Sequence, residues 1–177
     1  SVRCGNSGGG GEDGTEEGEG HDRGEEAGAY LPVLGAAIAA ARQGAHVSLL
    51  EGTSKIGGVM AFCPGMPWGG GYPVGSTIGG IFEELTSRMV NLSPPAALVR
   101  HSTLENFGAE VIYDHEAATF TMFEMLEEAG VSVHLNTIAG APTLAGNRIA
   151  SVEAYDRRGP LTFRPKLVID CSGDGET

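Results

Sequence analysis

The chain has 177 residues, the length of a single domain. It carries 23 Asp and Glu against 11 Lys and Arg, and the net charge of −12 argues against nucleic acid and anionic membranes as partners. Cys4, Cys63 and Cys171 are widely spaced without a Cys-x-x-Cys pair, which excludes a disulfide framework and a cysteine-based zinc site. With no apolar run long enough to predict a membrane span, we expect a soluble protein of a reducing, cytoplasmic compartment.

The first 28 residues differ in composition from the rest of the chain. They contain ten glycines and eight acidic residues against two basic ones, so about half of the net charge lies there. A segment with almost no aliphatic side chains cannot form a hydrophobic core. We therefore predict a disordered, removable tail over residues 1–28 and a partial domain over residues 29–177.

Apolar helical and strand patterns alternate in the remainder, which is typical of an α/β domain. The Ala-rich run over residues 34–44 predicts a buried helix that ends at a glycine. The apolar run over 46–50 predicts a short strand with Glu51 at its carboxyl end. A turn that contains Gly57 and Gly58 follows.

The patterns of the second half predict two more helices, a hairpin and two further strands. Asp114 is expected to cap the second of these helices. The predicted elements are helices over 81–89 and 114–129, a strand over 131–137, a hairpin formed by 147–155 and 161–164, and a last strand over 166–170.

Glu51 is the most informative candidate for a binding residue. An acidic side chain at the end of the second strand of a dinucleotide-binding fold accepts hydrogen bonds from the hydroxyls of the adenosine ribose. The same carboxylate, taken alone, is also compatible with a solvated strand end. The pattern of residues around it leaves both interpretations open.

Two longer segments, AAIAAARQGAHVSLLEGTSKIGG and LVIDCSGDGE, resemble the FAD-dependent oxidoreductases of the glutathione-reductase-like type, over about residues 33–177. The resemblance implies a Rossmann-like FAD-binding domain with a β-hairpin or meander crossover. It implies that VSVHLNT is the strand whose end contacts adenine. Members of this family are several hundred residues long, so we expect this chain to be an incomplete fragment.

The same resemblance implies FAD as the cofactor and transfer of hydride or electrons through the flavin to or from an unidentified small-molecule substrate. It names no catalytic residue, and the scattered histidines lack the spacing of a metal site. It implies no oligomeric state. The residues implied to contact FAD are Glu51, Gly57, Gly58, Gly173 and Asp174.

The phosphate-binding loop of the family is only partly present. Alignment of the Ala-rich helix places the three glycines of G-x-G-x-x-G at Gly28, Tyr30 and Val33, so only the first is a glycine. The second glycine lets the backbone approach the pyrophosphate, and the third lets helix and strand pack closely. Residues 22–27, moreover, are too polar for the central strand of a parallel sheet. We therefore expect weak FAD binding.

Two explanations fit the loss of two glycines from this motif. Either the N-terminal segment of about 30 residues is not the authentic family sequence, or the chain is a genuine relative that has lost its dinucleotide site. The alternative function is accordingly a non-catalytic relic or interaction module that has lost cofactor binding. An NAD(P)-dependent Rossmann enzyme is a further alternative, disfavoured by the Gly57-Gly58 pair and the terminal SGDG turn.

A Gly/Pro-rich loop over residues 61–75 is the remaining candidate segment. In a fold of this type the loop passes near the flavin ring. Cys63 is then either redox-active or an inert lining residue. Trp68 and Tyr72 either stack on the flavin or a substrate, or anchor the loop.

Overall fold

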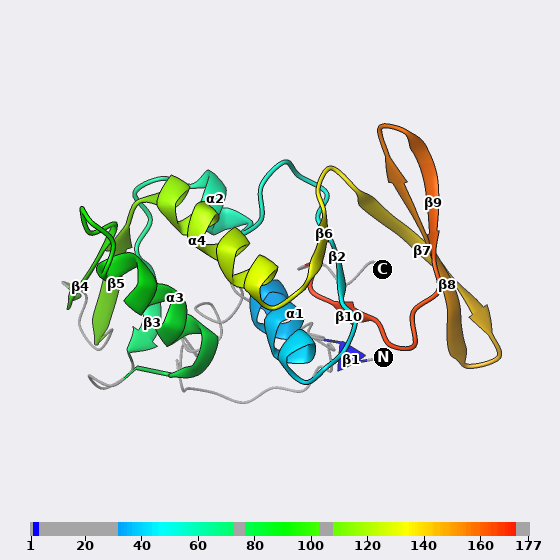
Figure 1. The fold of residues 1–177 in the computed structure, drawn as a ribbon, viewed down its shortest axis with the longest axis horizontal. Helices are drawn as coiled ribbons and strands as arrows, with labels where there is room; N and C mark the ends of the chain where they lie inside the picture. The colour runs from blue at the N-terminus through cyan, green and yellow to red at the C-terminus, as the bar shows by residue number, and fades with distance from the viewer. Residues whose placement is uncertain (1, 4–31, 73–76, 103–107, 173–177) are drawn as a thin grey trace, which may run out of the picture.

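A computed structural model describes residues 2–3, 32–72, 77–102 and 108–172 (Figure 1). The helices are α1 (Pro32–Arg42), α2 (Val59–Phe62), α3 (Gly80–Val90) and α4 (His115–Glu128). The strands are β1 (Val2–Arg3), β2 (Ser48–Leu50), β3 (Trp68–Tyr72), β4 (Ala97–His101), β5 (Ala109–Tyr113), β6 (Ser132–His134), β7 (Ile138–Ala145), β8 (Arg148–Asp156), β9 (Gly159–Phe163) and β10 (Ile169–Asp170).

Capping residues in the sequence mark the start of α4 and the ends of α4 and α1. The side chain of Asp114 accepts a hydrogen bond from the backbone N–H of Ala117 at 2.8 Å, which confirms the predicted cap of α4. Beyond the other end of α4, Gly130 has a φ of 76°, and Gly44 has a φ of 86° just after α1. These left-handed residues reverse the chain at low cost because glycine lacks a Cβ.

The hydrophobic core is built around α4. Its side chains Met122, Met125 and Leu126 are fully buried and belong to one cluster with Ile38 of α1 and Leu85 of α3. The helix also contacts α2 and β6. Because one helix serves as the common surface for the other three, their relative positions depend on its buried face.

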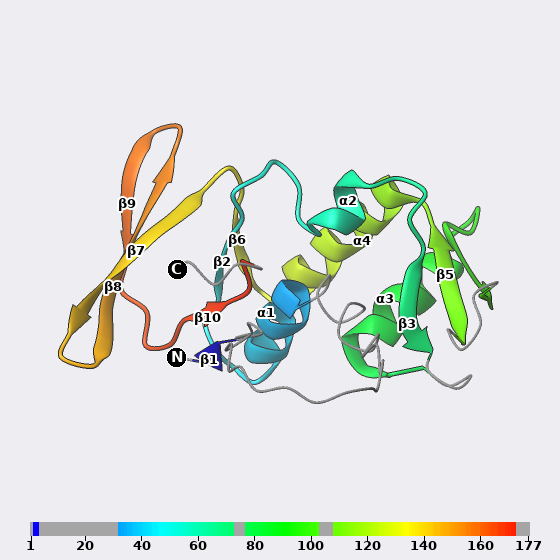
Figure 2. The same ribbon diagram turned by 180° about the vertical axis from the view of Figure 1, so that it is seen from behind.

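The strands form four small sheets in the described part of the chain. β2 pairs in parallel with β6, and β1 pairs in parallel with β10. The sheets β3-β5-β4 and β7-β8-β9 are antiparallel. Figures 1 and 2 show the β7-β8-β9 meander at one end of the molecule and the β3-β5-β4 sheet at the other, with α1 and α4 between them.

The meander confirms the predicted hairpin and extends it by one strand. β8 and β9 are the two predicted arms, and β7 adds a third strand that the sequence pattern did not predict. β3, β4 and β5 were also not predicted, and β3 lies within the stretch expected to be a loop. Its sequence WGGGY has no apolar alternation, and its pairing with β5 changes register between Trp68 and Tyr72.

The two parallel pairs do not join into one sheet in the described residues. β1 was not predicted and has only two residues, and the predicted last strand is shortened to Ile169–Asp170. Leu167 is 59% exposed and Ile169 is 38% exposed, although strands of parallel sheets are normally covered on both faces. The described residues therefore form an α/β fold in which the parallel strands are not joined into one sheet.

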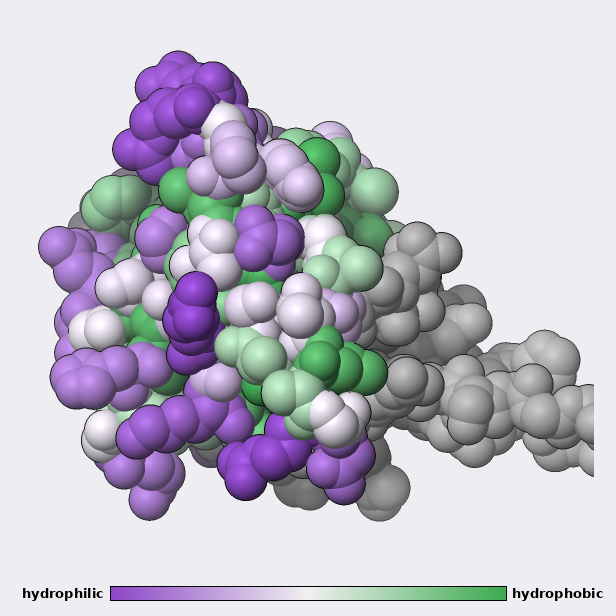
Figure 3. Space-filling view, turned by 90° about the vertical axis from the view of Figure 1, so that its right-hand side faces the viewer, coloured by the Kyte–Doolittle hydropathy of each residue, from purple (hydrophilic) through white to green (hydrophobic). Residues whose placement is uncertain are grey.

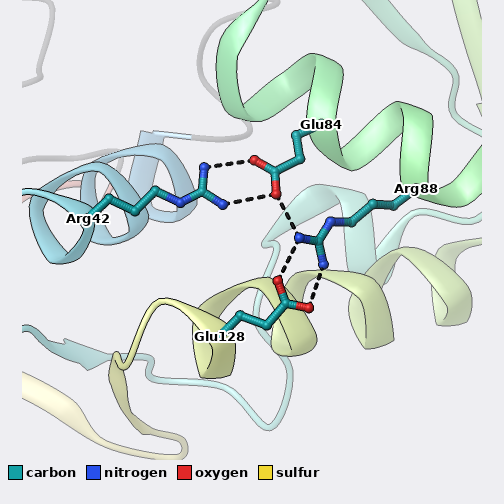
Figure 4. Close-up of polar contacts among 4 residues, drawn as sticks. All are labelled: Arg42, Glu84, Arg88 and Glu128. Atoms are coloured by element: carbon teal, nitrogen blue, oxygen red, sulfur yellow. Dashed lines mark hydrogen bonds and ion pairs between the residues drawn. The ribbon is translucent and has the colours of Figure 1, made fainter.

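A network of ion pairs connects the three long helices (Figure 4). Arg42 of α1 donates two hydrogen bonds to Glu84 of α3, at 2.7 and 2.9 Å. Arg88 of α3 donates to Glu84 at 2.7 Å and to both oxygens of Glu128 on α4, at 2.8 and 2.6 Å. The hydrogen bonds from Arg42 lower the pKa of Glu84, and those from Arg88 lower the pKa of Glu128.

We predict that Arg88→Gln lowers the free energy of unfolding by up to about 1 kcal/mol at pH 7 and low salt, because Arg88 bonds carboxylates on two helices. Carboxyl groups with lowered pKa values stabilise the fold above their ordinary pKa of 4.5, and this contribution is lost as the pH falls through the lowered values. Urea titrations at pH 7 and pH 3 should show the difference between variant and wild type shrink at acidic pH.

Arg158→Gln is the matched control for this prediction. Arg158 pairs with Asp156 two residues earlier, within one turn of the meander, and therefore connects no separate elements. Its replacement should change the free energy of unfolding less than Arg88→Gln does. Equal stability of Arg88→Gln and wild type at pH 7 would contradict a structural role for the network.

Candidate functional site

Glu51 directly follows β2, and its half-buried side chain is held through one oxygen. Oε1 accepts hydrogen bonds from the backbone N–H and the hydroxyl of Thr53, both at 2.8 Å. No residue in the described part of the chain donates to Oε2. The carboxylate is thus oriented by its own loop, and none of the described residues occupies the second oxygen, which can accept hydrogen bonds.

Backbone hydrogen bonds hold this loop against the segment that follows β6. Glu51 N donates to His134 O at 2.9 Å, and Thr137 N donates to Glu51 O at 2.9 Å. Asn136 N donates to Thr53 O at 2.8 Å. Asn136 has a φ of 50°, a left-handed conformation that asparagine tolerates better than most residues. The parallel pairing therefore continues beyond both strands and joins the two loops.

The loop is also attached to α4 and to the core. Lys55 forms an ion pair with Glu116 in the first turn of α4. Ile56 is 2% exposed and belongs to the hydrophobic cluster. Thr53 Oγ1 also lies 2.7 Å from Lys55 O, which competes with Glu51 Oε1 for the single hydroxyl proton. Side-chain and backbone contacts thus support the segment from Glu51 to Gly57 along its length.

Gly57 and Gly58 have different surroundings. Gly57 is buried with a φ of 107°, and a Cβ there would lie 2.6 Å from Cε of Met122. Gly58 is exposed with a φ of 51°, and a Cβ there would meet no atom within 4 Å. Gly57 therefore allows close packing on α4, whereas Gly58 presents bare backbone at the surface.

Two aromatic residues of the 61–75 segment, Trp68 and Tyr72, pack against the protein. Trp68 is 6% exposed, and its ring centroid lies 4.2 Å from that of Tyr113 and 5.8 Å from that of Phe82. The ring of Tyr72 contacts Phe82 at 5.8 Å. Trp68 and Tyr72 thus anchor this segment, as one of the two sequence interpretations held, while Cys63 is exposed at the end of α2.

Tyr113 is partly buried in an aromatic cluster that it forms with Trp68, Tyr72 and Phe82. Tyr113 donates a hydrogen bond to Met60 O at 3.2 Å. Removal from solvent raises the pKa of the Tyr113 hydroxyl, which therefore stays protonated at neutral pH. The cluster contributes to packing between α2, α3 and the β3-β5-β4 sheet.

The start of β7 is a neighbour of the Glu51 loop that was not predicted from the sequence. Ile138 begins this strand and is 64% exposed, and a Cβ on Gly52 would lie 3.7 Å from its Cγ1. Ile138 is thus a neighbour of the Glu51 loop. The signal that indicates β7 is the turn Gly146-Asn147, which joins it to β8.

Several predicted positions lie outside the described residues, namely Gly28, Tyr30, Gly173 and Asp174. Val33 lies in α1 and packs, half-buried, against the core. Cys171 is half-buried. In the ranges that the structure describes, no group of three or more His, Cys, Asp or Glu side chains is arranged to hold a metal ion.

The model of the family of FAD-dependent oxidoreductases matches residues 28–177. The chain belongs to this family. FAD is the cofactor of the FAD-dependent oxidoreductases, and the resemblance noted in the sequence is thereby confirmed. None of the helices in the described part of this family member has both the length and the apolar character needed to cross a membrane.

Two solved structures are similar to this chain at low sequence identity. THI4 of Thermovibrio ammonificans is 18% identical with a TM-score of 0.49, over 77% of this chain and 52% of THI4. PqsL, a probable FAD-dependent monooxygenase of Pseudomonas aeruginosa, is 17% identical with a TM-score of 0.46, over 81% of this chain and 38% of PqsL. The chain thus spans about half or less of these proteins, and no curated protein matches it.

The described residues fit an adenine dinucleotide. Oε2 of Glu51 has no donor in the described part of the chain, and Gly58 offers backbone that no side chain covers. A ribose presents hydroxyl donors, and a pyrophosphate requires close approach to the main chain. The Glu51 carboxylate and the Gly58 backbone lie on the same loop, which is held by hydrogen bonds and by packing on α4.

We predict that Gly57→Ala lowers the free energy of unfolding by roughly 2–3 kcal/mol, since the residue is left-handed and its Cβ would collide with Met122. Gly58→Ala should cost only about 1–2 kcal/mol, because it adds backbone strain without a collision. Gly35→Ala in α1, with nothing within 4 Å of its Cβ, should stabilise by about 0.5–1 kcal/mol. Urea titrations measure all three, and equal losses at Gly57 and Gly58 would contradict the packing described.

Proposed function

We propose that this chain is the FAD-binding part of an FAD-dependent oxidoreductase, and that the Glu51 loop binds the adenosine half of FAD. The observation that carries the proposal is the carboxylate of Glu51, which is oriented through Oε1 by Thr53 while Oε2 has no donor in the described residues. Ribose hydroxyls donating to a carboxylate form charge-assisted hydrogen bonds, which are stronger than neutral ones.

The other proposed contacts extend from this carboxylate along the cofactor. Gly58 allows the pyrophosphate to approach the main chain, and Gly57 keeps the loop close to α4. The resemblance adds Gly173 and Asp174, which follow β10. When bound, the flavin supplies the transfer of hydride or electrons to or from a small-molecule substrate, and the protein supplies position and electrostatics.

The segment before α1 weakens this site. α1 begins at Pro32, which has no N–H to donate to a phosphate, and Val33 stands where the family has its third glycine. We therefore propose that affinity depends mainly on the Glu51 loop and is low compared with a protein that has the complete glycine motif. The acidic composition and cysteine spacing favour a cytoplasmic location.

The proposed folded unit remains residues 29–177, with residues 1–28 as a removable tail. β1 lies within residues 1–28 and pairs with β10, so removal of the tail would also remove this pair. The alternative function, a non-catalytic relic without cofactor, is favoured by the two separate parallel pairs. FAD binding distinguishes the two functions, since a relic retains the fold and binds no flavin.

We predict that Glu51→Gln weakens FAD binding about tenfold or more, because the amide replaces the oxygen that accepts from the ribose with a donor. The variant keeps Oε1, and with it the hydrogen bonds from Thr53. Equilibrium dialysis against FAD gives both dissociation constants. Glu124→Gln, an exposed position on α4, is the control and should bind as the wild type does.

Two results would count against the proposed function. Absence of FAD binding by the wild type at millimolar concentration would favour the relic. Equal affinity of wild type and Glu51→Gln would remove Glu51 from the site, even if the protein binds FAD.

A further inference from the structure

β4 is an edge strand that pairs on one side alone in the described residues. It stands at the end of the sheet order β3-β5-β4, at the end of the molecule opposite the meander (Figures 1 and 2). Its five residues pair with β5 without a register shift. Leu98 is 61% exposed and Val99 is 37% exposed. A regular, apolar edge of this kind can pair with a further strand.

The other edges of the antiparallel sheets are less suited to such pairing. The pairing of β3 and that of β7 are interrupted by register shifts. β9 contains Pro160, which has no N–H to donate. Figure 3 views the meander end, where apolar groups lie between hydrophilic ones. Among the antiparallel edges of the described residues, β4 is therefore the regular one.

The hydrogen bonds that flank β4 show which of its main-chain groups face the open side. Asp114 N donates to Ala96 O at 2.8 Å, and Ser102 N donates to Gly108 O at 3.0 Å. Such bonds fall on every second residue of an antiparallel strand, so the even-numbered residues of β4 bond to β5. The N–H and C=O groups that point to the open side belong to the odd-numbered residues, which are Ala97, Val99 and His101.

The positive charge on this strand is held back from the open side. Arg100 lies directly opposite Glu110 on β5, and its Nε donates to Glu110 Oε1 at 2.8 Å. Charged side chains on natural edge strands prevent pairing with other chains. Arg100 does not protect β4 in this way, because its guanidinium is drawn over β5 and neutralised by a carboxylate that is 6% exposed.

We propose that two copies of this chain associate through β4, with the two strands antiparallel and Val99 on the twofold axis. In this register Val99 pairs with its own copy, and Ala97 pairs with His101. Every outward main-chain group then has a partner, and about six hydrogen bonds form between the copies. Leu98 of one copy lies opposite Arg100 of the other and covers the alkyl part of its side chain.

The two neighbouring registers are less favourable. An axis at Leu98 would place His101 opposite Pro95, which has no N–H. An axis at Arg100 would place the two Arg100 side chains directly opposite each other, and like charges in that position are destabilising. The register centred on Val99 instead places Arg100 opposite an uncharged leucine, so the charges of the two edges are compatible in this register.

The small area of the contact makes the expected dimer weak. Five residues from each copy bury less than the roughly 1,200 Å² of a standard stable interface. The net charge of −12 on each copy also opposes association. We therefore expect the dimer at millimolar protein concentration, in salt that screens this charge.

The first test is sedimentation equilibrium of the whole chain from micromolar to millimolar concentration. The average mass of the wild type should rise toward that of a dimer. Leu98→Lys places a second positive charge opposite Arg100 of the other copy and should keep the chain monomeric. Ile78→Lys is the matched control, because Ile78 is also 61% exposed and lies outside β4, and it should associate as the wild type does.

Val99→Pro is a second variant, and it changes no charge. It removes an N–H that points to the open side, so the hydrogen bonds from β4 to β5 remain. The dimer loses two hydrogen bonds, one for each copy, and association should weaken about tenfold or more. Far-UV circular dichroism verifies that each variant is folded.

Amide NMR spectra over the same concentration range test the register. Concentration should shift the amides of Val99 and His101 most, and those of Leu98 and Arg100 less, because the latter bond to β5. A monomer at every concentration overturns the proposal. A dimer that Ile78→Lys abolishes and Leu98→Lys preserves also overturns it, since Ile78 bonds to β3 and the contact would then lie at that side of the sheet.

Discussion

The parallel pairing of β2 with β6 does not stop at the ends of the strands, and the proposed site depends on this continuation. Backbone hydrogen bonds from Glu51, Asn136 and Thr137 connect the loop after β2 with the turn after β6. Main-chain bonds of this kind place Glu51 and the start of β7 without help from side-chain identity. The meander is then attached to the carboxylate through Ile138, so a change in the register of β2 and β6 would move the whole proposed site.

The helical core gives this pair of loops a rigid support. α4 carries the buried methionines that contact the other helices, and it also holds the loop through Lys55 and Glu116. Gly57 lets the loop lie directly on Met122. Exposed ion pairs between α1, α3 and α4 contribute less than this packing, because solvent screens them. The weakest part of the described fold is the two-residue pair of β1 with β10, where Ile169 is 38% exposed.

Much of this arrangement can be predicted from the sequence, and the rest depends on tertiary pairing. Asp114 marks the start of α4, and left-handed glycines follow the ends of α4 and α1. These signals are local in the sequence, so these helix ends can be predicted from it. Glu51 and the glycine pair were singled out by spacing after an apolar strand, although their contact with FAD stays a prediction. β3 was missed because its three glycines carry no apolar alternation, and it is a strand only through pairing with β5. β7 was missed as well, since the pairing of Ile138 with Tyr155 on β8 is a cross-strand register and not a local property of either segment.

The most direct measurement is a two-dimensional amide NMR titration of the chain with FAD, which detects weak binding and locates it by residue. Binding of the adenosine half of FAD at the Glu51 loop predicts that the largest shifts belong to Thr53 and Gly58 in this loop and to Thr137 and Ile138 after β6, with smaller ones along the meander. Shifts confined to the β3-β5-β4 sheet, or none at millimolar FAD, would contradict it.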